Sequence, residues 1–197
     1  GQVADDAAVL AGSAMDASAG QNINAVLLAS VRRRNPGAHV IFKPHPDVEN
    51  LGRKGALSPD QERCDADTVA RHTSLDTLLP MVTRIETYSS LSGFEALLRG
   101  IPVTVHGMPF YAGWGLTTDL HMNPRRTRRI ALDELVAAAL IAYPRYWDPV
   151  SGLACPPEVA LGRLNELRMK PPGLRGRLGQ AAGKTVIVWR RAAMSLK

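Results

Sequence analysis

The stretch "RIETYSSLSGFEALLRGIPVTVHG", residues 84–107, decides the fold class of this chain. Its first part, 84–89, and its last part, 102–107, contain β-branched residues bounded by turn-forming residues, which predicts two strands. Between them, residues 92–100 place apolar side chains at helical spacing and end at Gly100, which predicts a helix closed by a glycine. Two strands joined through a helix form a crossover unit, so we expect them to run parallel.

The same alternation continues on both sides of this stretch. Helical spacing predicts further helices at residues 21–34, 74–81 and 131–143, and a β-branched run predicts a strand at 38–42. A polar, glycine-bearing loop is expected from residue 47 to about residue 59. Helices alternating with strands indicate an α/β fold, a Rossmann-like parallel sheet flanked by helices.

The composition is that of a globular protein, with 197 residues of which 45% are hydrophobic and 21% charged. No apolar run reaches the roughly 18 to 20 residues that would span a bilayer. Two cysteines, Cys64 and Cys155, fit a reducing compartment better than a disulfide scaffold. The chain starts at Gly1 with neither an initiator methionine nor an apolar leader, so we expect a fragment of a longer protein, and nothing in it indicates secretion.

The net charge of +6 is concentrated in the tail, because no acidic residue occurs from Arg168 to the end. Such a tail is either a solvated basic segment or a segment attracted to an anionic membrane surface. Nucleic acid is the least favoured partner, since no aromatic residues alternate with the basic ones and no recognised binding module is visible.

Ligands of parallel α/β sheets bind at the carboxyl ends of the strands, where this chain has three unusual loops. The first is "KPHPD", residues 43–47. Its two prolines restrict the backbone on either side of His45, and Lys43 lies two residues away, so both side chains can face one side. Together they suit a phosphate, which the imidazole N–H would bind and to which it could deliver a proton. The alternative is a turn with a packed ring.

The second loop, "YSSLSG", leads into the helix predicted at 92–100. Ser89, Ser90 and Ser92 precede the helix, where hydroxyls and free N–H groups can bind phosphate oxygens. Glu95, one turn into the helix, could accept hydrogen bonds from a ribose diol. The alternative is that the serines only cap the helix and that Glu95 only complements its dipole.

The third loop, "GMPFYAGWGLTTD", carries Tyr111 and Trp114 in a chain that is only 5% aromatic. Aromatic side chains at the ligand edge could stack on a base or sugar or gate a site. A buried loop that plugs the core is the alternative.

Two adjacent carboxylates, Asp5 and Asp6, follow the first few residues, which resemble the end of a strand. One of them could act as a nucleophile on a sugar and form a glycosyl intermediate, although a solvated helix cap fits the spacing equally well. No histidine or cysteine pair has metal-ligand spacing, so no metal site is predicted.

Several ordered strings resemble the KpsC-like capsule polysaccharide biosynthesis family, the bacterial β-Kdo glycosyltransferases. The resemblance runs from Gly1 to about Leu167 and rests on the strings "GQVADDA", "NPGAHVIFKPHPD", "TYSSLSGFEALLRGIPVTVHGMPFYAGWGLT", "RR" at 125–126 and "LDELVAAALIAYPRYWDP". It implies one half of a GT-B glycosyltransferase that moves the sugar acid Kdo from CMP-Kdo onto a lipid-linked Kdo acceptor, with retention of configuration. It also implies cytoplasmic placement, peripheral to the inner membrane, and no metal.

The resemblance further implies roles for individual residues and a division of the chain. His45 matches the His-Pro motif at the CMP phosphate, Ser89 and Ser90 match the serine motif that grips CMP, and Asp6, with Asp5 as the alternative, matches the proposed nucleophile. Residues 1–167 would form the nucleotide-sugar-binding domain and 168–197 the basic tail. A separate N-terminal GT-B half would bind the acceptor. Two alternatives stay open: a non-catalytic nucleotide-binding or interaction module, and a GT-B enzyme that uses another nucleotide sugar.

Overall fold

The computed structural model describes residues 1–11 and 21–169. It divides into two compact units at the junction between Leu132 and Asp133, which lies inside the 1–167 domain expected from the sequence. Of the predicted basic tail, only Arg168 and Met169 lie within the described residues.

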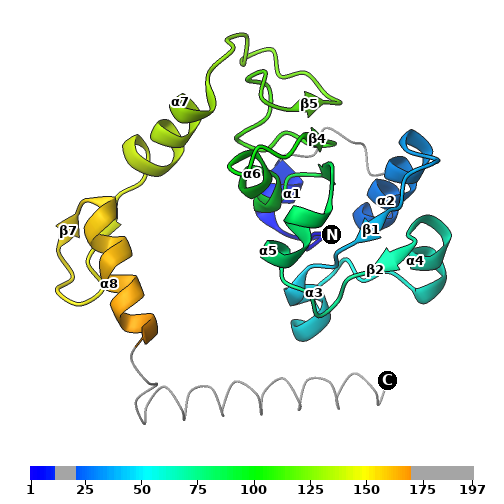
Figure 1. Ribbon diagram of the computed structural model, residues 1–197, viewed down its shortest axis with the longest axis horizontal. Helices are drawn as coiled ribbons and strands as arrows, with labels where there is room; N and C mark the ends of the chain where they lie inside the picture. Colours follow the sequence, from blue (N-terminus) through cyan, green and yellow to red (C-terminus); the bar gives the residue numbers. More distant parts are fainter. Residues whose placement is uncertain (12–20, 170–197) are drawn as a thin grey trace. The chain divides into compact units, whose positions relative to one another are not determined.

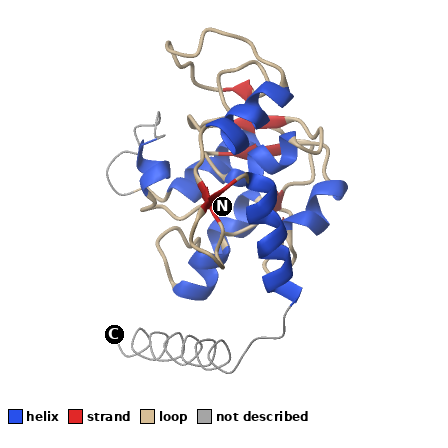
Figure 2. Ribbon diagram, turned by 90° about the vertical axis from the view of Figure 1, so that its left-hand side faces the viewer, coloured by secondary structure: helices blue, strands red, loops and turns tan. Residues whose placement is uncertain are grey.

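Unit 1, residues 1–132, contains short strands joined by helices and loops (Figures 1 and 2). In chain order its elements are α1 (Ala7–Ala11), α2 (Ile23–Arg34), β1 (Ile41–Phe42), α3 (Pro46–Leu51), α4 (Pro59–Asp65), β2 (Thr68–Val69), α5 (Leu75–Leu78), the 3₁₀ turn η1 (Leu79–Met81), β3 (Ile85–Thr87), α6 (Leu91–Leu97), β4 (Val103–Val105) and β5 (Thr118–Asp119).

All strand pairs of unit 1 are parallel, as the alternation of helices and strands predicts. Strand β1 pairs with β2, with Ile41 opposite Thr68. Strands β3, β4 and β5 form a second group in that order, with Glu86 opposite Thr104 in the first pair. The predicted strand-helix-strand unit at 84–107 is therefore confirmed as β3, α6 and β4, and the α/β class is confirmed with it.

The loop expected between residues 47 and 59 is wrong in part, because α3 fills its first half and α4 begins at its end. Both helices start with a proline at the first helical position, where the missing N–H costs nothing. Ser58 and Gln61 form a capping box at α4, in which each side chain accepts from the other's backbone N–H. These start signals were present in the sequence and mark the helices that the polar composition concealed.

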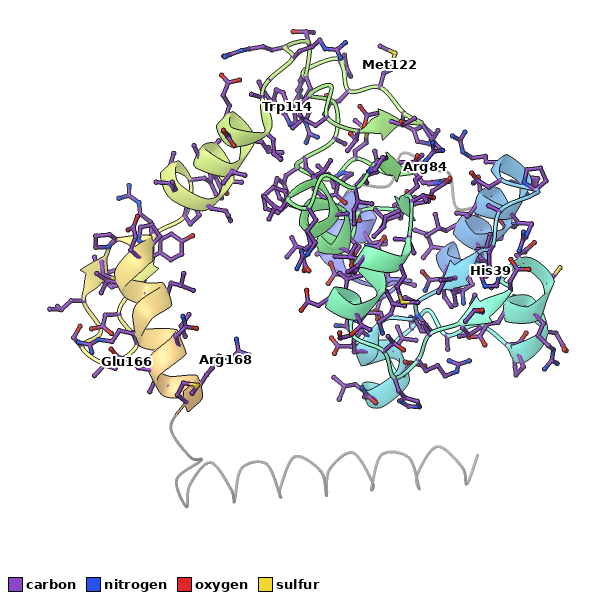
Figure 3. The ribbon with its side chains drawn as sticks, in the orientation of Figure 1. His39, Arg84, Trp114, Met122, Glu166 and Arg168 are labelled. Carbon is purple, nitrogen blue, oxygen red and sulfur yellow. The ribbon has the colours of Figure 1, made fainter. Side chains whose placement is uncertain are left out.

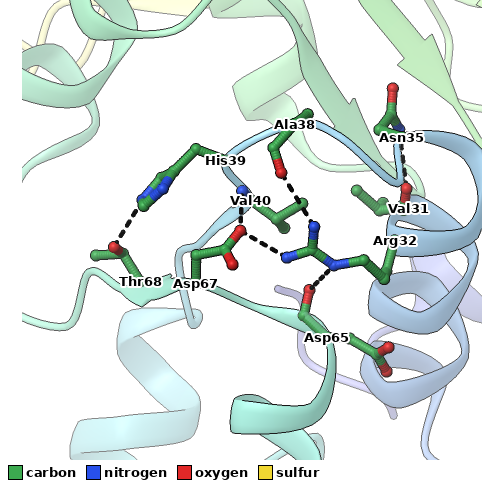
Figure 4. Close-up of polar contacts among 9 residues, drawn as sticks. All are labelled: Val31, Arg32, Asn35, Ala38, His39, Val40, Asp65, Asp67 and Thr68. Carbon is green, nitrogen blue, oxygen red and sulfur yellow. Dashed lines mark hydrogen bonds and ion pairs between the residues drawn. The ribbon is translucent and has the colours of Figure 1, made fainter.

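A polar network fixes the C-terminal turn of α2 against the starts of β1 and β2 (Figure 4). Arg32 donates to the carbonyl oxygens of Asp65 and Ala38 and pairs with the Asp67 carboxylate at 2.6 Å. Asp67 also accepts from the backbone N–H of Val40 at 2.7 Å. The Arg32 guanidinium, followed by the Val40 N–H, holds the pKa of Asp67 below its usual range.

Unit 2 comprises α7 (Leu132–Val136), which begins at the boundary, a π-helical continuation η2 (Ala137–Ala142), an antiparallel pair of β6 (Tyr146–Trp147) with β7 (Ala154–Cys155), and α8 (Pro157–Met169). The helix predicted at 131–143 is confirmed as α7 and η2. Within the described ranges, no helix is both long and apolar enough to cross a membrane.

Candidate functional site

A cleft of about 1320 Å³ runs through unit 1 along β1 and β3. Its lining includes five of the residues predicted at the ligand edge: Lys43, His45, Ser90, Ser92 and Glu95. Lys43 and His45 follow β1, and the other three follow β3. The carboxyl ends of these two parallel strands thus bring the first two predicted loops to one end of one cleft, as the α/β topology requires.

The His45 ring is held by a cap. His45 has extended backbone geometry (φ −73°, ψ 134°) and is the N-cap of α3, where its Nδ1 accepts from the backbone N–H of Asp47 at 3.1 Å. In a neutral ring with Nδ1 as the acceptor, the proton sits on Nε2. The flanking prolines and this bond therefore orient a ring whose Nε2–H donor is available to a ligand.

The serine loop is ordered by hydrogen bonds among its own hydroxyls. Ser90 is the N-cap of α6, its Oγ accepting from the Ser92 N–H at 3.2 Å and donating to the Ser92 Oγ at 3.0 Å. Ser89 does not line the cleft, because the Gln2 side chain contacts both its backbone N–H and its Oγ, at 2.8 and 3.1 Å. Of the three serines, Ser90 and Ser92 are therefore the ones that line the cleft.

Tyr111 does not have the ligand-stacking position predicted for it. Its side chain is fully buried, and its hydroxyl donates to the Ser90 carbonyl oxygen at 2.5 Å. The ring packs against Phe94 and Phe110, with centroids 6.3 and 5.2 Å away, and because the residue is fully buried no face of the ring is open to a base or sugar. Burial raises the pKa of the Tyr111 phenol well above its ordinary value. Tyr111 instead supports the serine loop from behind.

Gly93 is required by this arrangement, and a matched pair of glycine substitutions tests it. A Cβ at Gly93 would lie 2.3 Å from the Tyr111 hydroxyl oxygen, whereas a Cβ at Gly162, in α8, would meet nothing within 4 Å. We expect Gly93→Ala to destabilise the chain by about 1–3 kcal/mol through overpacking. Gly162→Ala should stabilise it by about 0.5–1 kcal/mol, because alanine favours helix. Urea unfolding of both variants measures the difference, and shifts of the same sign would contradict it.

Trp114 is half-buried in the loop after β4 (Figure 3). It is not part of the cleft lining. Its Nε1–H donates to the Phe110 carbonyl oxygen at 2.8 Å, and the Arg126 guanidinium carbon lies 5.5 Å from its ring centroid. One face of the indole is thus already paired with a cation. The structure does not bring Trp114 together with the two loops at the cleft.

Asp5 and Asp6 also lie outside the cleft lining, at the start of α1. The Asp5 carboxylate is exposed and pairs with Arg53 at 3.0 Å. The Asp6 carbonyl oxygen accepts the first helical hydrogen bond, from Leu10 at 3.0 Å. The Asp5 carboxylate is therefore partly neutralised by a neighbouring cation.

Gln2 is a residue that the sequence interpretation missed. It is buried, its backbone N–H and C=O both bond to the Asn24 side chain, at 2.8 and 2.7 Å, and its side chain holds Ser89. Asn24 in turn donates to the Gly55 carbonyl oxygen at 2.8 Å. The N-terminal segment, α2 and the serine loop are joined through these two amides.

Farther along the cleft, the carboxylate of Glu86 is paired with neighbouring side chains. Glu86 in β3 contacts His106 Nε2 at 2.8 Å and accepts from the Asn35 amide at 2.7 Å. Burial favours the neutral carboxyl, but the bonds from His106 and Asn35 and the nearby Arg34 outweigh it and hold the pKa of Glu86 below its usual range. Within residues 1–11 and 21–169, no group of three or more His, Cys, Asp or Glu is arranged to hold a metal ion.

Comparisons with known proteins identify relatives of the whole chain. Residues 1–146 match the family described as "Capsule polysaccharide biosynthesis protein". The capsule polysaccharide modification protein LipA of Neisseria meningitidis serogroup A is 44% identical over 194 residues, which cover 96% of this chain and 27% of LipA. The lipopolysaccharide-processing protein LpsZ of Rhizobium meliloti is 44% identical over 146 residues, 74% of this chain and 32% of LpsZ. The chain thus spans about a quarter to a third of the length of these curated relatives.

Two solved structures share the fold. The β-Kdo 2,7 transferase of Thermosulfurimonas dismutans KpsC superposes with a TM-score of 0.74 at 39% identity, covering 85% of this chain and 53% of that one. The β-Kdo 2,4 transferase of the same KpsC gives a TM-score of 0.67 at 35% identity, covering 83% and 49%. The match to about half of each structure confirms the Rossmann-like GT-B half predicted from the sequence.

Proposed function

Because this chain belongs to the capsule polysaccharide biosynthesis protein family, we propose that it is the donor-binding half of a retaining glycosyltransferase that takes Kdo from CMP-Kdo. The observation that carries the proposal is the capped His45 ring at the polar end of the cleft. A ring with Nδ1 engaged in the backbone and Nε2–H free presents one fixed donor to an anion. The phosphate of a cytidylate is such an anion.

The residues around His45 suit the rest of the nucleotide. Lys43 adds positive charge, and the hydroxyls of Ser90 and Ser92 can bind phosphate oxygens. Glu95, half-buried on α6, lines the same end of the cleft and can accept hydrogen bonds from the ribose hydroxyls. The donor is thus recognised by one imidazole, one ammonium, hydroxyls and one carboxylate, and the proposal includes no metal.

In the proposed reaction a carboxylate attacks the anomeric carbon of Kdo, and the bond from that carbon to the CMP phosphate oxygen breaks. His45 stabilises the departing phosphate through Nε2–H. We assign the carboxylate to Asp6, with Asp5 as the alternative, as the resemblance to the family implies. The oxygen of the acceptor hydroxyl then attacks the same carbon, the carboxylate departs and the hydroxyl proton is released to solvent, so that two inversions give net retention.

The proposal extends to partners outside the chain. The acceptor is a lipid-linked Kdo held by a separate N-terminal GT-B half, and the enzyme works in the cytoplasm at the surface of the inner membrane. The basic residues after Arg168 would favour an anionic lipid surface, although residues 170–197 lie outside the described part of the chain.

Calorimetric titration with CMP tests the donor site directly. We expect saturable binding of CMP to the full-length protein, weaker binding of UMP, UDP and GDP, and loss of at least tenfold in CMP affinity in His45→Ala. His39→Ala is the matched control, because His39 lines the opposite end of the same cleft and contacts Thr68 Oγ1 at 2.9 Å. Equal binding of all four nucleotides, or equal losses in the two variants, would refute the proposed donor.

A further inference from the structure

The parallel sheet of unit 1 is divided by the cleft. Among the described residues, β1 pairs only with β2, and β3 pairs only with β4. The cleft runs between the unpaired edge of β1 and the unpaired edge of β3. In a parallel strand alternate residues bond to opposite neighbours. Val40 and Phe42 accept from residues at the β2 side, and Ile85 and Thr87 bond toward β4. The backbone groups of Ile41, Lys43 and Glu86 are therefore directed toward the cleft.

The first residues of the chain sit at one end of this gap and touch both edges. The Gly1 nitrogen donates to the Lys43 carbonyl oxygen at 2.7 Å, on the β1 side. The Gln2 side chain bonds to Ser89, just after β3. Gly1 also lies tightly against the Phe42 ring, since a Cβ on it would be 3.2 Å from the ring. Gly1 and Gln2 thus occupy the position of a strand between β1 and β3.

The chain direction at Gly1 fixes the direction of any strand that enters there. Lys43 and Ser89 follow the carboxyl ends of β1 and β3, and the chain then leaves the sheet toward α1. Residues before Gly1 would therefore run back between β1 and β3 toward their amino ends, parallel to both. The cleft continues that far, because its lining includes His39 and Arg84 at those ends (Figure 3).

We infer that the apolar part of this cleft is the slot of a sixth, parallel strand formed by the residues immediately preceding Gly1 in the longer polypeptide. This strand completes the order β2-β1-strand-β3-β4-β5. Its residue two positions before Gly1 bonds to Ile41 and Lys43, and its residue directly before Gly1 bonds to Glu86. About five residues at ~3.3 Å each fill the slot.

The walls of the slot specify the chemistry of this strand. On α2 they are Leu27, Leu28 and Val31, and on the α5 and η1 segment they are Leu78 and Leu79. A central parallel strand covered by helices on both faces is apolar at nearly every position. The preceding residues should therefore be a continuous β-branched and aliphatic run.

With this strand in place, only part of the cleft is left as a ligand site. A strand in the slot occupies the apolar space below Gly1 and leaves the polar end, with His45, Ser90, Ser92 and Glu95, open at the carboxyl edge. Because Asp5 and Asp6 follow this strand closely in the chain, the strand also restrains where these two residues lie. The inference stands on the sheet geometry alone, so it survives if the proposed CMP-Kdo donor is wrong.

Hydrogen exchange measured by NMR tests the strand. The chain is extended by the eight residues that precede Gly1 in the parent polypeptide, and the control carries a Gly-Ser extension of the same length. We expect the natural extension to slow exchange at the amides of Ile41, Lys43 and Glu86 by about 100-fold or more relative to the control. The amides of Phe42 and Thr87 face β2 and β4 and serve as internal references whose exchange changes much less.

Four results would overturn the inference. The first is equal exchange at these amides with both extensions. The second is amide protection in the unextended chain that depends on protein concentration, and the third is amide protection that is lost when the chain is truncated after Met169. The fourth is the presence of two or more charged residues among the five that precede Gly1. The second result would assign the slot to another copy of the chain, and the third would assign it to residues 170–197.

Discussion

Full-length protein in which His45 is replaced by alanine should transfer Kdo at least about 100-fold more slowly than the wild type, because the departing phosphate loses its Nε2–H donor. The loss should fall mainly on kcat, since the charge on the leaving phosphate develops during the reaction. Steady-state kinetics with CMP-Kdo and a Kdo-bearing acceptor measure it. Removal of the ring also removes the cap of α3, which by itself costs about 1 kcal/mol of stability.

His45→Asn separates the cap from the chemistry. Asparagine is among the best N-cap residues, so this variant should unfold like the wild type, yet it lacks the imidazole and should be as inactive as the alanine variant. His39→Ala, at the other end of the cleft, should keep full activity. Activity restored in His45→Asn would mean that His45 acts only as a cap, and the assigned role would be wrong.

The chain that starts at Gly1 should gain stability as the pH rises from 5 to 8. Burial, together with the nearby Lys43 charge, lowers the pKa of the Gly1 ammonium from 8.0 to about 5. Below pH 5 the folded and unfolded states both carry the proton, and the folded state bears the full cost of the buried charge. Between pH 5 and 8 only the unfolded state binds it, so stability rises, by up to about 4 kcal/mol. Urea unfolding across this range measures the rise.

The chain with the natural extension is the control for this pH dependence. It has a peptide N–H at Gly1, so the rise should be absent, and the groups common to both chains cancel in the difference. Glu86, whose pKa is held below its ordinary 4.5, loses its contribution only at more acidic pH. The same slope in both chains would show that the Gly1 ammonium is solvated in the folded state.

Local sequence signals determined most of the secondary structure of unit 1. The strand-helix-strand unit at 84–107, the helix ending at Arg34 and the break after it are all found where periodicity and capping residues predict them. The two helices α3 and α4 were missed because polar composition was given more weight than Pro46, Pro59 and the Ser58 capping box. Their start signals are local, so the information was present in the sequence.

The sequence also determined which loops share an edge, because parallel strands bring their carboxyl ends together whatever their side chains are. This placed Lys43, His45, Ser90, Ser92 and Glu95 at one end of one cleft. The residues of the third loop, Tyr111 and Trp114, do not line this cleft, and phosphate binding by the other two loops stays a prediction.

Only the tertiary structure decided that Tyr111 is buried and that Asp5 forms an ion pair. Tyr111 lies behind the serine loop, and Asp5 contacts Arg53, 48 residues away in the chain. Neither contact could be predicted from the periodicity of the sequence. The gap between β1 and β3 is likewise invisible to local patterns. Sheet order is set by hydrogen bonds between segments far apart in the chain, so it exists only once those segments have been brought together in the fold.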